Sequence, residues 1–201
     1  MKSKWNERYQ GQTFFYGQEA NDFLKDSARL IKARGNVLCL AEGEGRNAIF
    51  LAKLGFHVTA IDQSDIGLEK LRVWASNEGL IIKTIVADLE NYKIEENAWD
   101  AIISIWCHLP SVLRKKVHSQ SVLGLKANGL FILEAYIPLQ LDYKTGGPSD
   151  VDFLVTTKLL IEELLGLNCT NIMETLREIH EGAGHNGMSA VVQCIAKKDL
   201  K

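Results

Sequence analysis

Short apolar runs alternate with amphipathic segments along most of this chain. Runs of strand length occur at 37–41, 56–61, 81–87, 99–106 and 130–136. Segments with apolar residues at helical spacing occur at 21–34, 46–54, 64–77, 111–123 and 157–165. Strands that alternate with helices pair in parallel, because each crossover helix returns the chain to the same end of the sheet. The alternation therefore predicts an α/β fold with a mostly parallel sheet and helices on both faces.

Two more strand-like runs follow near the end of the chain, at 171–180 and 188–197. No helical segment separates them, so we expect an antiparallel strand pair at one edge of the sheet. With this pair the sheet has seven strands and a Rossmann-like arrangement. Such sheets bind ligands at the carboxyl ends of their strands. Residues that carry chemistry should therefore follow the strands directly.

The composition is that of an ordinary globular protein. The chain has 201 residues, of which 46% are hydrophobic and 24% charged, and its net charge is −2. We expect one domain over 1–201, with an aromatic N-terminal strap at 1–20 and a core at 21–201. The weak negative charge argues against a nucleic-acid partner, which usually requires a basic face. The sequence has no apolar run of membrane-spanning length, so we expect no membrane partner.

The four cysteines lie far apart, at Cys39, Cys107, Cys169 and Cys194. They form no Cys-x-x-Cys pair, so we expect no metal site. Cys39 and Cys194 lie within apolar runs and are expected in the core. Four unpaired thiols are typical of a reducing compartment, and with no signal peptide in the sequence they predict a cytoplasmic location.

A glycine turn follows the first strand, in the string Ala41-Glu42-Gly43-Glu44-Gly45. Glycines at such a turn let the backbone come close to a ligand, and the next helix presents free N–H groups. Carboxylates here would repel a pyrophosphate, but they could accept hydrogen bonds from the ammonium group of a methionine moiety. A tight strand-to-helix turn with solvated acids is the alternative interpretation.

Acidic residues also follow the second and third strands, at Asp62 and Asp88. A carboxylate at the first position can accept hydrogen bonds from both ribose hydroxyls of an adenosine. One at the second position could accept the exocyclic amine of an adenine. The alternatives are a helix N-cap for Asp62, a role that Ser64 can also fill, and a turn-forming residue for Asp88.

Aromatic residues and histidines mark three further segments. Trp106 and His108 follow the fourth strand, where His108 is a candidate base and Trp106 a packing surface that positions an acceptor. Tyr16 in the N-terminal strap and Asn21 directly after it could close over a bound cofactor. His185 lies in a glycine-rich segment between the last two strands and could reach the same pocket. Structural roles for all of these side chains are the alternative.

These motifs, taken in order, resemble class I S-adenosylmethionine-dependent methyltransferases, and in particular the bacterial branch related to tellurite-resistance and thiopurine methyltransferases. The resemblance implies a Rossmann-like fold and S-adenosylmethionine as the cofactor. It also implies a donor site in which Glu42, Gly43 and Gly45 surround the methionine part, Asp62 binds the ribose, and Asp88 with Leu89 borders the adenine. The family usually has Asp at the place of Cys39 and Gly at the place of Ala41, and this chain departs from it at both.

We therefore expect an enzyme that transfers a methyl group from S-adenosylmethionine to a small molecule, such as a thiol, selenium or tellurium species. The main task of such a protein is to align the acceptor with the methyl group. An NAD-dependent dehydrogenase is one alternative, because Gly43, Gly45 and Ala48 fit the dinucleotide fingerprint. A non-catalytic module that binds an adenosyl ligand is the other.

Overall fold

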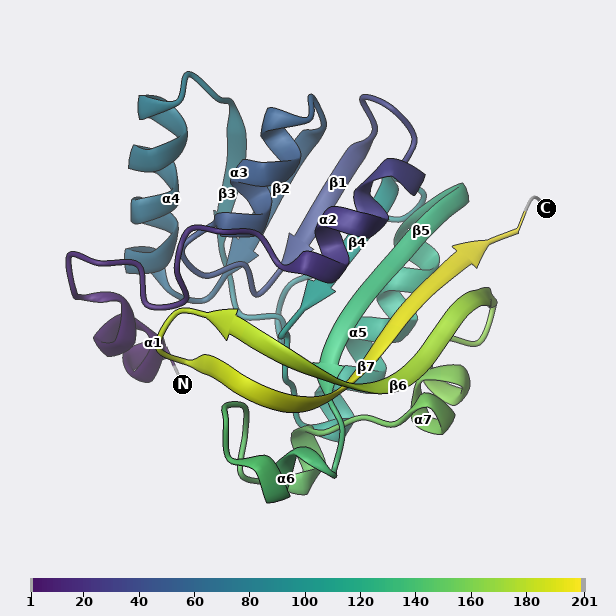
Figure 1. Ribbon diagram of the computed structural model, residues 1–201. Coiled ribbons are helices and arrows are strands. Elements are labelled where there is room, and N and C mark those ends of the chain that lie inside the picture. The colour runs from purple at the N-terminus through teal and green to yellow at the C-terminus, as the bar shows by residue number, and fades with distance from the viewer. Residues whose placement is uncertain (1, 200–201) are drawn as a thin grey trace.

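A seven-stranded sheet forms the centre of the protein, which we describe from a computed structural model over residues 2–199. The strand order is β3-β2-β1-β4-β5-β7-β6 (Figure 1). The strands are β1 (Asn36–Leu40), β2 (His57–Asp62), β3 (Ile82–Val86), β4 (Trp99–Ile105), β5 (Leu125–Tyr136), β6 (Leu167–Glu181) and β7 (His185–Lys198). The first five pair in parallel, and β7 pairs antiparallel with both β5 and β6. The predicted fold class is confirmed.

Helices cover both faces of the sheet (Figure 1). They are α1 (Lys2–Tyr9), α2 (Asp22–Ser27), α3 (Arg46–Lys53), α4 (Asp65–Asn77), α5 (Ser111–Gly124), α6 (Gln140–Tyr143) and α7 (Thr157–Glu163). Helices α2, α3 and α4 pack on one face, and α5 and α7 on the other. Two short 3-10 turns, Ala28–Leu30 and Val151–Phe153, complete the helical structure of the described residues.

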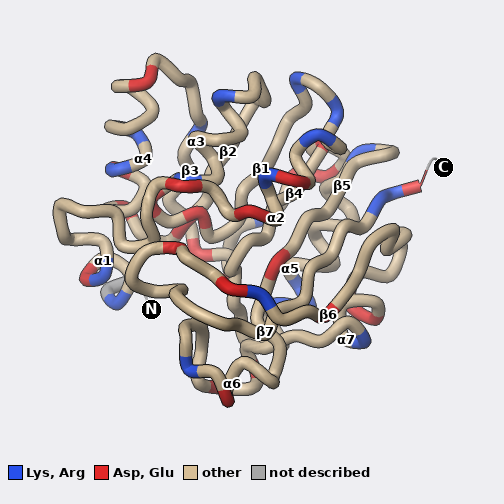
Figure 2. Tube along the Cα trace, in the orientation of Figure 1, with Lys and Arg blue, Asp and Glu red and all other residues tan. Residues whose placement is uncertain are grey.

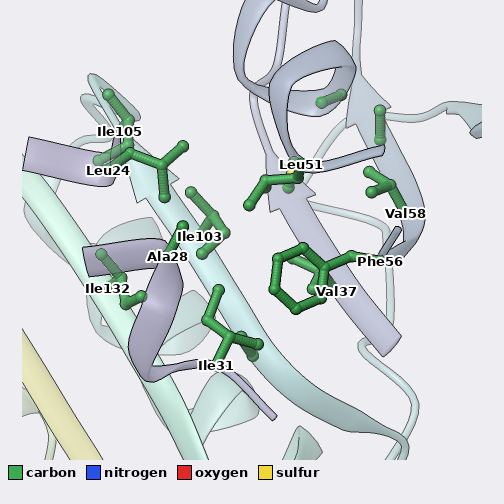
Figure 3. Packing of buried hydrophobic residues seen from close by; sticks show 14 of the residues in the cluster. Leu24, Ala28, Ile31, Val37, Leu51, Phe56, Val58, Ile103, Ile105 and Ile132 are labelled. Carbon is green, nitrogen blue, oxygen red and sulfur yellow. The ribbon is translucent and has the colours of Figure 1, made fainter. Parts of the chain in front are cut away.

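The core consists of two apolar layers, one on each face of the sheet. Successive residues of a strand point to opposite faces, so Val37 and Cys39 of β1 enter one layer while Leu38 and Leu40 enter the other. Figure 3 shows the first layer, in which Leu24 and Ala28 meet Ile103 and Ile132. Full burial of each such aliphatic side chain contributes about 1.5–3 kcal/mol. The predicted burial of Cys39 and Cys194 is confirmed, since both are 0% exposed.

The helix expected at 21–34 is shorter in the structure. The α-helix ends at Ser27, whose hydroxyl donates to the carbonyl of Phe23 at 2.7 Å, and a 3-10 turn follows. Beyond that turn the chain is extended at Ile31. Ser hydroxyls that bond to the preceding turn weaken a helix, which accounts for the early end. The segment at 1–20, expected as an aromatic strap, begins with the helix α1.

The C-terminal strand pair is longer than the apolar runs suggest. β6 has 15 residues and β7 has 14, and both continue to the turn at 182–184. Figure 1 shows the tip of this hairpin beside the N-terminal segment. There the N–H of Ala183 donates to the carbonyl of Phe15 at 2.9 Å. The added length therefore brings His185 to the carboxyl ends of the parallel strands.

Lys and Arg residues are scattered along the trace, with Asp and Glu residues interspersed (Figure 2). Within residues 2–199 we find no helix with the length and apolar character needed to cross a bilayer.

Candidate active site

A cavity of about 510 Å³ opens at the carboxyl ends of β1, β2, β3 and β4. Of the residues singled out in the sequence, the cavity is lined by Tyr16, Glu42, Gly45, Asp62, Asp88, Leu89, Trp106, His108 and His185. Gly43 and Asn21 do not line it. Further wall residues come from α1, the loop at 146–148 and the hairpin turn at 183–184. The volume is within the range of small-ligand sites in proteins.

The glycine turn has a left-handed backbone at three positions, with φ of 50° at Ala41, 62° at Gly43 and 95° at Gly45. At Ala41 the backbone is thus left-handed although the residue is not glycine, at a cost of about 1–2 kcal/mol. A Cβ atom on Gly45 would lie 2.3 Å from Cδ1 of Leu71 in α4. One on Gly43 would lie 2.6 Å from the hydroxyl of Tyr9 in α1. Both glycines are therefore required by the close packing of helices over the turn.

Glu42 lies at the N-terminus of α3 and lines the cavity. Its Oε1 accepts a hydrogen bond from the N–H of Ala48 at 2.7 Å. Burial raises the pKa of Glu42 to about 7, and the hydrogen bond from Ala48 opposes this rise. A helix N-terminus favours the ionised form. The second oxygen can therefore face a positively charged group in the cavity.

Glu44 has a different role. Its Oε1 pairs with Nζ of Lys70 at 2.6 Å, and its Oε2 accepts from the N–H of Phe15 at 2.7 Å. The carboxylate thus holds the N-terminal strap against α4, and only Glu42 of the two turn acids has the freedom to bind a ligand.

Asp62 ends β2, with its carboxylate at the cavity wall. Oδ2 accepts from the N–H of Gly43 at 2.9 Å, and Oδ1 from the N–H of Ser64 at 2.7 Å. Burial raises the pKa of Asp62, and these backbone hydrogen bonds oppose the rise. Ser64 itself caps α4 through the N–H of Gly67 at 3.0 Å. Because each carboxylate oxygen has a second lone pair, Asp62 can still accept from a diol.

Asp88 and Leu89 lie side by side in the wall after β3. Oδ1 of Asp88 accepts from the N–H of Glu90 at 2.9 Å, as in a turn. Leu89 is 7% exposed and presents an apolar surface. The pair offers both a flat apolar contact and a nearby acceptor, which suits an adenine ring.

Four aromatic rings form a stack along the other side of the cavity, which we call the aromatic column: Tyr16, His185, Trp106 and Tyr136. Ring centroids are 4.8 Å apart for Tyr16 and His185, 4.9 Å for His185 and Trp106, and 4.6 Å for Trp106 and Tyr136. The rings come from the strap, β7, the segment after β4, and β5. Gly147 lies against Tyr136, where a Cβ atom would be 2.4 Å from the ring.

Both histidines of the cavity make hydrogen bonds within the protein. Nε2 of His108 accepts from the N–H of Tyr136 at 3.2 Å, and burial lowers the pKa of His108 to about 4. Nδ1 of His185 is 2.7 Å from the hydroxyl of Tyr136, and burial lowers the pKa of His185 well below its ordinary value. Both imidazoles are therefore neutral at neutral pH.

Asn21, expected to close over the cavity, lies in a buried polar network and does not line the cavity. It is 0% exposed, and its Oδ1 accepts from the N–H of Leu24 at 3.0 Å, which caps α2. Its Nδ2 donates to Glu134 at 2.5 Å and to Glu181 at 2.9 Å. Glu181 also pairs with Arg46. This network fixes the start of α2 beneath the hairpin.

The sequence did not single out two residues at the site. Tyr136 is buried behind the cavity wall, against Trp106 and His185, and as the last residue of an apolar strand it has the sequence position of a core residue. Arg8 lies in α1 between Trp5 and Tyr9 and lines the cavity with both. Trp5 and Tyr9 are four residues apart, a spacing that places both rings on one face of a helix and could have indicated α1.

This sheet order, the glycine turn and the acid after β2 define the fold of class I S-adenosylmethionine-dependent methyltransferases. Residues 37–129 match the methyltransferase-domain family. Over 79 residues the chain is 35% identical to TehB of Haemophilus influenzae, a probable S-adenosyl-L-methionine-dependent methyltransferase. That match covers 39% of this chain and 27% of TehB, so the chain aligns with just over a quarter of this relative. The expected resemblance to the TehB-related branch is confirmed.

Solved structures agree on the fold. The crystal structure of TehB from Haemophilus influenzae has a TM-score of 0.74 and 20% identity, over 98% of this chain and 67% of that one. A structure concerned with the conversion of a disulfide bond into a thioacetal group during echinomycin biosynthesis has a TM-score of 0.79 and 16% identity, over 99% of this chain and 92% of that one. The expected cofactor, S-adenosylmethionine, agrees with the description of TehB as a probable S-adenosyl-L-methionine-dependent methyltransferase.

The cavity fits this donor in its chemistry. Glu42 can face the ammonium group, Asp62 the ribose hydroxyls, and Leu89 the adenine ring. The same wall is unsuited to a pyrophosphate, since Glu42 and Glu44 would lie beside its negative charges.

Proposed function

We propose that the protein transfers the methyl group of S-adenosylmethionine to a small acceptor with a soft nucleophilic atom. One observation carries the proposal: the donor-side residues Glu42 and Asp62 line the same cavity as three rings of the aromatic column, Tyr16, Trp106 and His185. A donor bound at the first side would therefore direct its reactive end toward the second.

The protein contributes alignment. The sulfonium of the donor supplies an activated methyl group, so the surrounding residues have to hold the two reactants in line. Tyr16 and Trp106 provide flat walls for the acceptor, and the loop at 146–148 closes the space beside them. His108 and His185 are neutral hydrogen-bonding groups of this wall, since burial depresses the pKa of each.

The acceptor side is small and largely aromatic, which suits a small molecule and leaves no room for a duplex or a folded protein. A thiol, selenium or tellurium nucleophile reacts without a strong base, in agreement with neutral histidines. The sulfur chemistry in the description of one structural neighbour points in the same direction.

Binding experiments separate this proposal from its alternatives. S-adenosylhomocysteine should raise the thermal unfolding midpoint of the protein, whereas NADH should not, because Glu42 and Glu44 would oppose its pyrophosphate. A screen of thiols, thiopurines, selenite and tellurite with a radiolabelled donor then identifies the acceptor. Stabilisation by NADH alone would favour a dehydrogenase, and donor binding without any methylated acceptor would favour a non-catalytic module.

The proposal predicts a small effect of His108→Ala on turnover. His108 accepts from the N–H of Tyr136 and has a pKa lowered to about 4, so it contributes to the wall rather than removing a proton. We expect methylation of a thiol to fall less than about tenfold, well below the 10²–10⁴-fold loss of acid–base catalysis. A larger loss, with unchanged donor affinity and a bell-shaped pH profile in the parent, would make His108 a base.

Donor affinity should depend on pH through Glu42. The pKa of this carboxyl is about 7 in the ligand-free protein, and only the ionised form attracts the ammonium of the donor. Affinity for S-adenosylhomocysteine should therefore rise by about tenfold from about pH 6 to about pH 8. Calorimetry at several pH values tests this, with Glu42→Gln as the control, whose affinity should be weaker and less dependent on pH. An unchanged slope in Glu42→Gln would exclude Glu42 as the titrating group.

The same pKa has the opposite effect on the stability of the ligand-free protein. The folded carboxyl binds its proton more tightly than the unfolded one, whose pKa is near 4.5. The contribution of Glu42 to the free energy of unfolding is therefore largest below pH 4.5 and falls as the pH rises to about 7.

We also propose a cytoplasmic location and a single domain over 1–201. The four cysteines are free, which suits a reducing compartment. The seven strands form one continuous sheet, which supports a single folding unit.

A further inference from the structure

Glu181 is a buried acid behind the wall of the cavity. It is the last residue of β6, is 7% exposed and does not itself line the cavity. Its Oε2 accepts a hydrogen bond from Nε1 of Trp106 at 2.5 Å and pairs with Nη2 of Arg46. Its Oε1 accepts from Nδ2 of Asn21 at 2.9 Å. One carboxylate thus holds side chains from three separate segments of the chain.

Two of these side chains belong to different parts of the cavity wall. Arg46 begins α3 directly after the glycine turn and lines the cavity there. Trp106 follows β4 and belongs to the aromatic column. Both donate to the same oxygen of Glu181. The position of this carboxylate therefore sets how the aromatic wall lies relative to the glycine turn.

Trp106 needs more than stacking to have one orientation. Its rings stack on those of His185 and Tyr136, but stacked rings can slide and turn within their common plane. The hydrogen bond to the buried carboxylate fixes the direction of Nε1 as well. The backbone at Trp106 is left-handed, with a φ of 56°, and its N–H donates to the carbonyl of Glu134 at 3.0 Å. Main chain and indole are thus each held by one hydrogen bond.

We propose that Glu181 is the positioning residue of the acceptor wall, and that it acts through Nε1 of Trp106. This inference rests on the proposed function, in which Trp106 is a flat wall for the acceptor. Transfer of a methyl group depends on the alignment of two reactants, so a small displacement of the wall lowers the rate. Glu181 touches neither reactant and contributes only the orientation of the indole.

Nuclear magnetic resonance of the indole N–H groups tests the contact without any substrate. The chain has four tryptophans, and the indole signal that is missing in Trp106→Phe belongs to Trp106. In Glu181→Gln this proton signal should move upfield, and the N–H should exchange with water about tenfold faster, because the charge-assisted hydrogen bond is lost. Glu178→Gln is the matched control, an exposed acid of the same strand, and should leave the signal unchanged.

Methylation of thiophenol, a thiol with a flat ring, tests the role. Glu181→Gln should lower kcat/KM for this probe by about 10–100-fold. Calorimetry with S-adenosylhomocysteine should show a loss of less than about threefold, because Glu42 and Asp62 keep their hydrogen bonds to the backbone. Glu178→Gln should match the parent in both measurements.

Trp106→Phe tests the same contact from the other side, and it leaves the ion pair of Glu181 with Arg46 in place. It therefore remains informative if Glu181→Gln does not fold. The variant keeps a flat ring but loses the indole N–H, so kcat/KM for thiophenol should fall by about tenfold. Combined with Glu181→Gln, the loss should be no larger than that of Glu181→Gln alone, because the two changes remove one interaction.

Four results would overturn the proposal. One is an unchanged indole signal of Trp106 in folded Glu181→Gln, and another is parental kcat/KM in Trp106→Phe. Losses that multiply in the double variant, or equal falls in donor affinity and kcat/KM, would leave Glu181 with a general structural role. A parent protein that binds no S-adenosylhomocysteine would contradict the proposed function instead, whereas the indole signal reports on Glu181 alone.

Discussion

Replacement of Asp62 by Ala should reduce the affinity for S-adenosylhomocysteine by at least tenfold, and by up to about 10³-fold. The carboxylate can accept from both ribose hydroxyls, and hydrogen bonds to a charged group contribute about 1.5–3 kcal/mol each. It also accepts from the N–H groups of Gly43 and Ser64, so the change loosens the glycine turn itself. Calorimetry gives the affinity, and thermal unfolding shows whether the variant is folded.

Ser64→Ala is a matched control for the second effect of Asp62→Ala, the loosening of the structure around the glycine turn. It removes the cap of α4, a hydrogen bond of 3.0 Å to the N–H of Gly67, while Asp62 is retained. We expect a loss of about 1 kcal/mol in stability. Donor affinity should stay within a few-fold of the parent. A folded Asp62→Ala variant with parental affinity would remove Asp62 from the donor site.

Gly45→Val should destabilise the protein by about 3 kcal/mol or more. The backbone at this position has a φ of 95°, and the new Cβ atom would lie 2.3 Å from Cδ1 of Leu71, which is 0% exposed. Either α4 moves away from the turn or the turn changes shape, and donor binding is lost in both cases. Urea unfolding measures the stability, and calorimetry with S-adenosylhomocysteine measures the binding.

Two variants separate backbone strain from collision. Gly55 has a φ of 86° with no atom within 4 Å of a Cβ atom, so Gly55→Ala should cost only the strain, about 1–2 kcal/mol. Combining Gly45→Val with Leu71→Ala should recover part of the loss if the collision dominates. A Gly45→Val variant as stable as Gly55→Ala would show that the packing of α4 tolerates a side chain at the turn.

Much of the donor side follows from local sequence. Continuous apolar runs, a glycine turn and acids at strand ends are patterns within a few residues of one another, and parallel strands bring their carboxyl ends together. Asp62 therefore lies where its position after the second apolar run predicts. The sequence did not predict why position 43 has to be glycine. A side chain there would collide with Tyr9 of α1, and the sequence gave no sign that this helix packs on the turn.

The acceptor side was decided by tertiary structure. The aromatic column joins Tyr16, Trp106, Tyr136 and His185. Tyr16 and His185, whose rings stack, are 169 positions apart in the sequence (185 − 16). Its geometry depends on the length of the β6–β7 hairpin and on the loop at 146–148, which bring rings from distant parts of the chain together. Tertiary structure also decided that Arg8 forms no ion pair within residues 4–199 and that Asn21 is hydrogen-bonded to Glu134 and Glu181. Both outcomes depend on which side chains from distant parts of the sequence meet. Local hydrogen bonding and periodicity thus determined the strands and the turn, whereas long-range packing determined which polar groups remain available for a ligand.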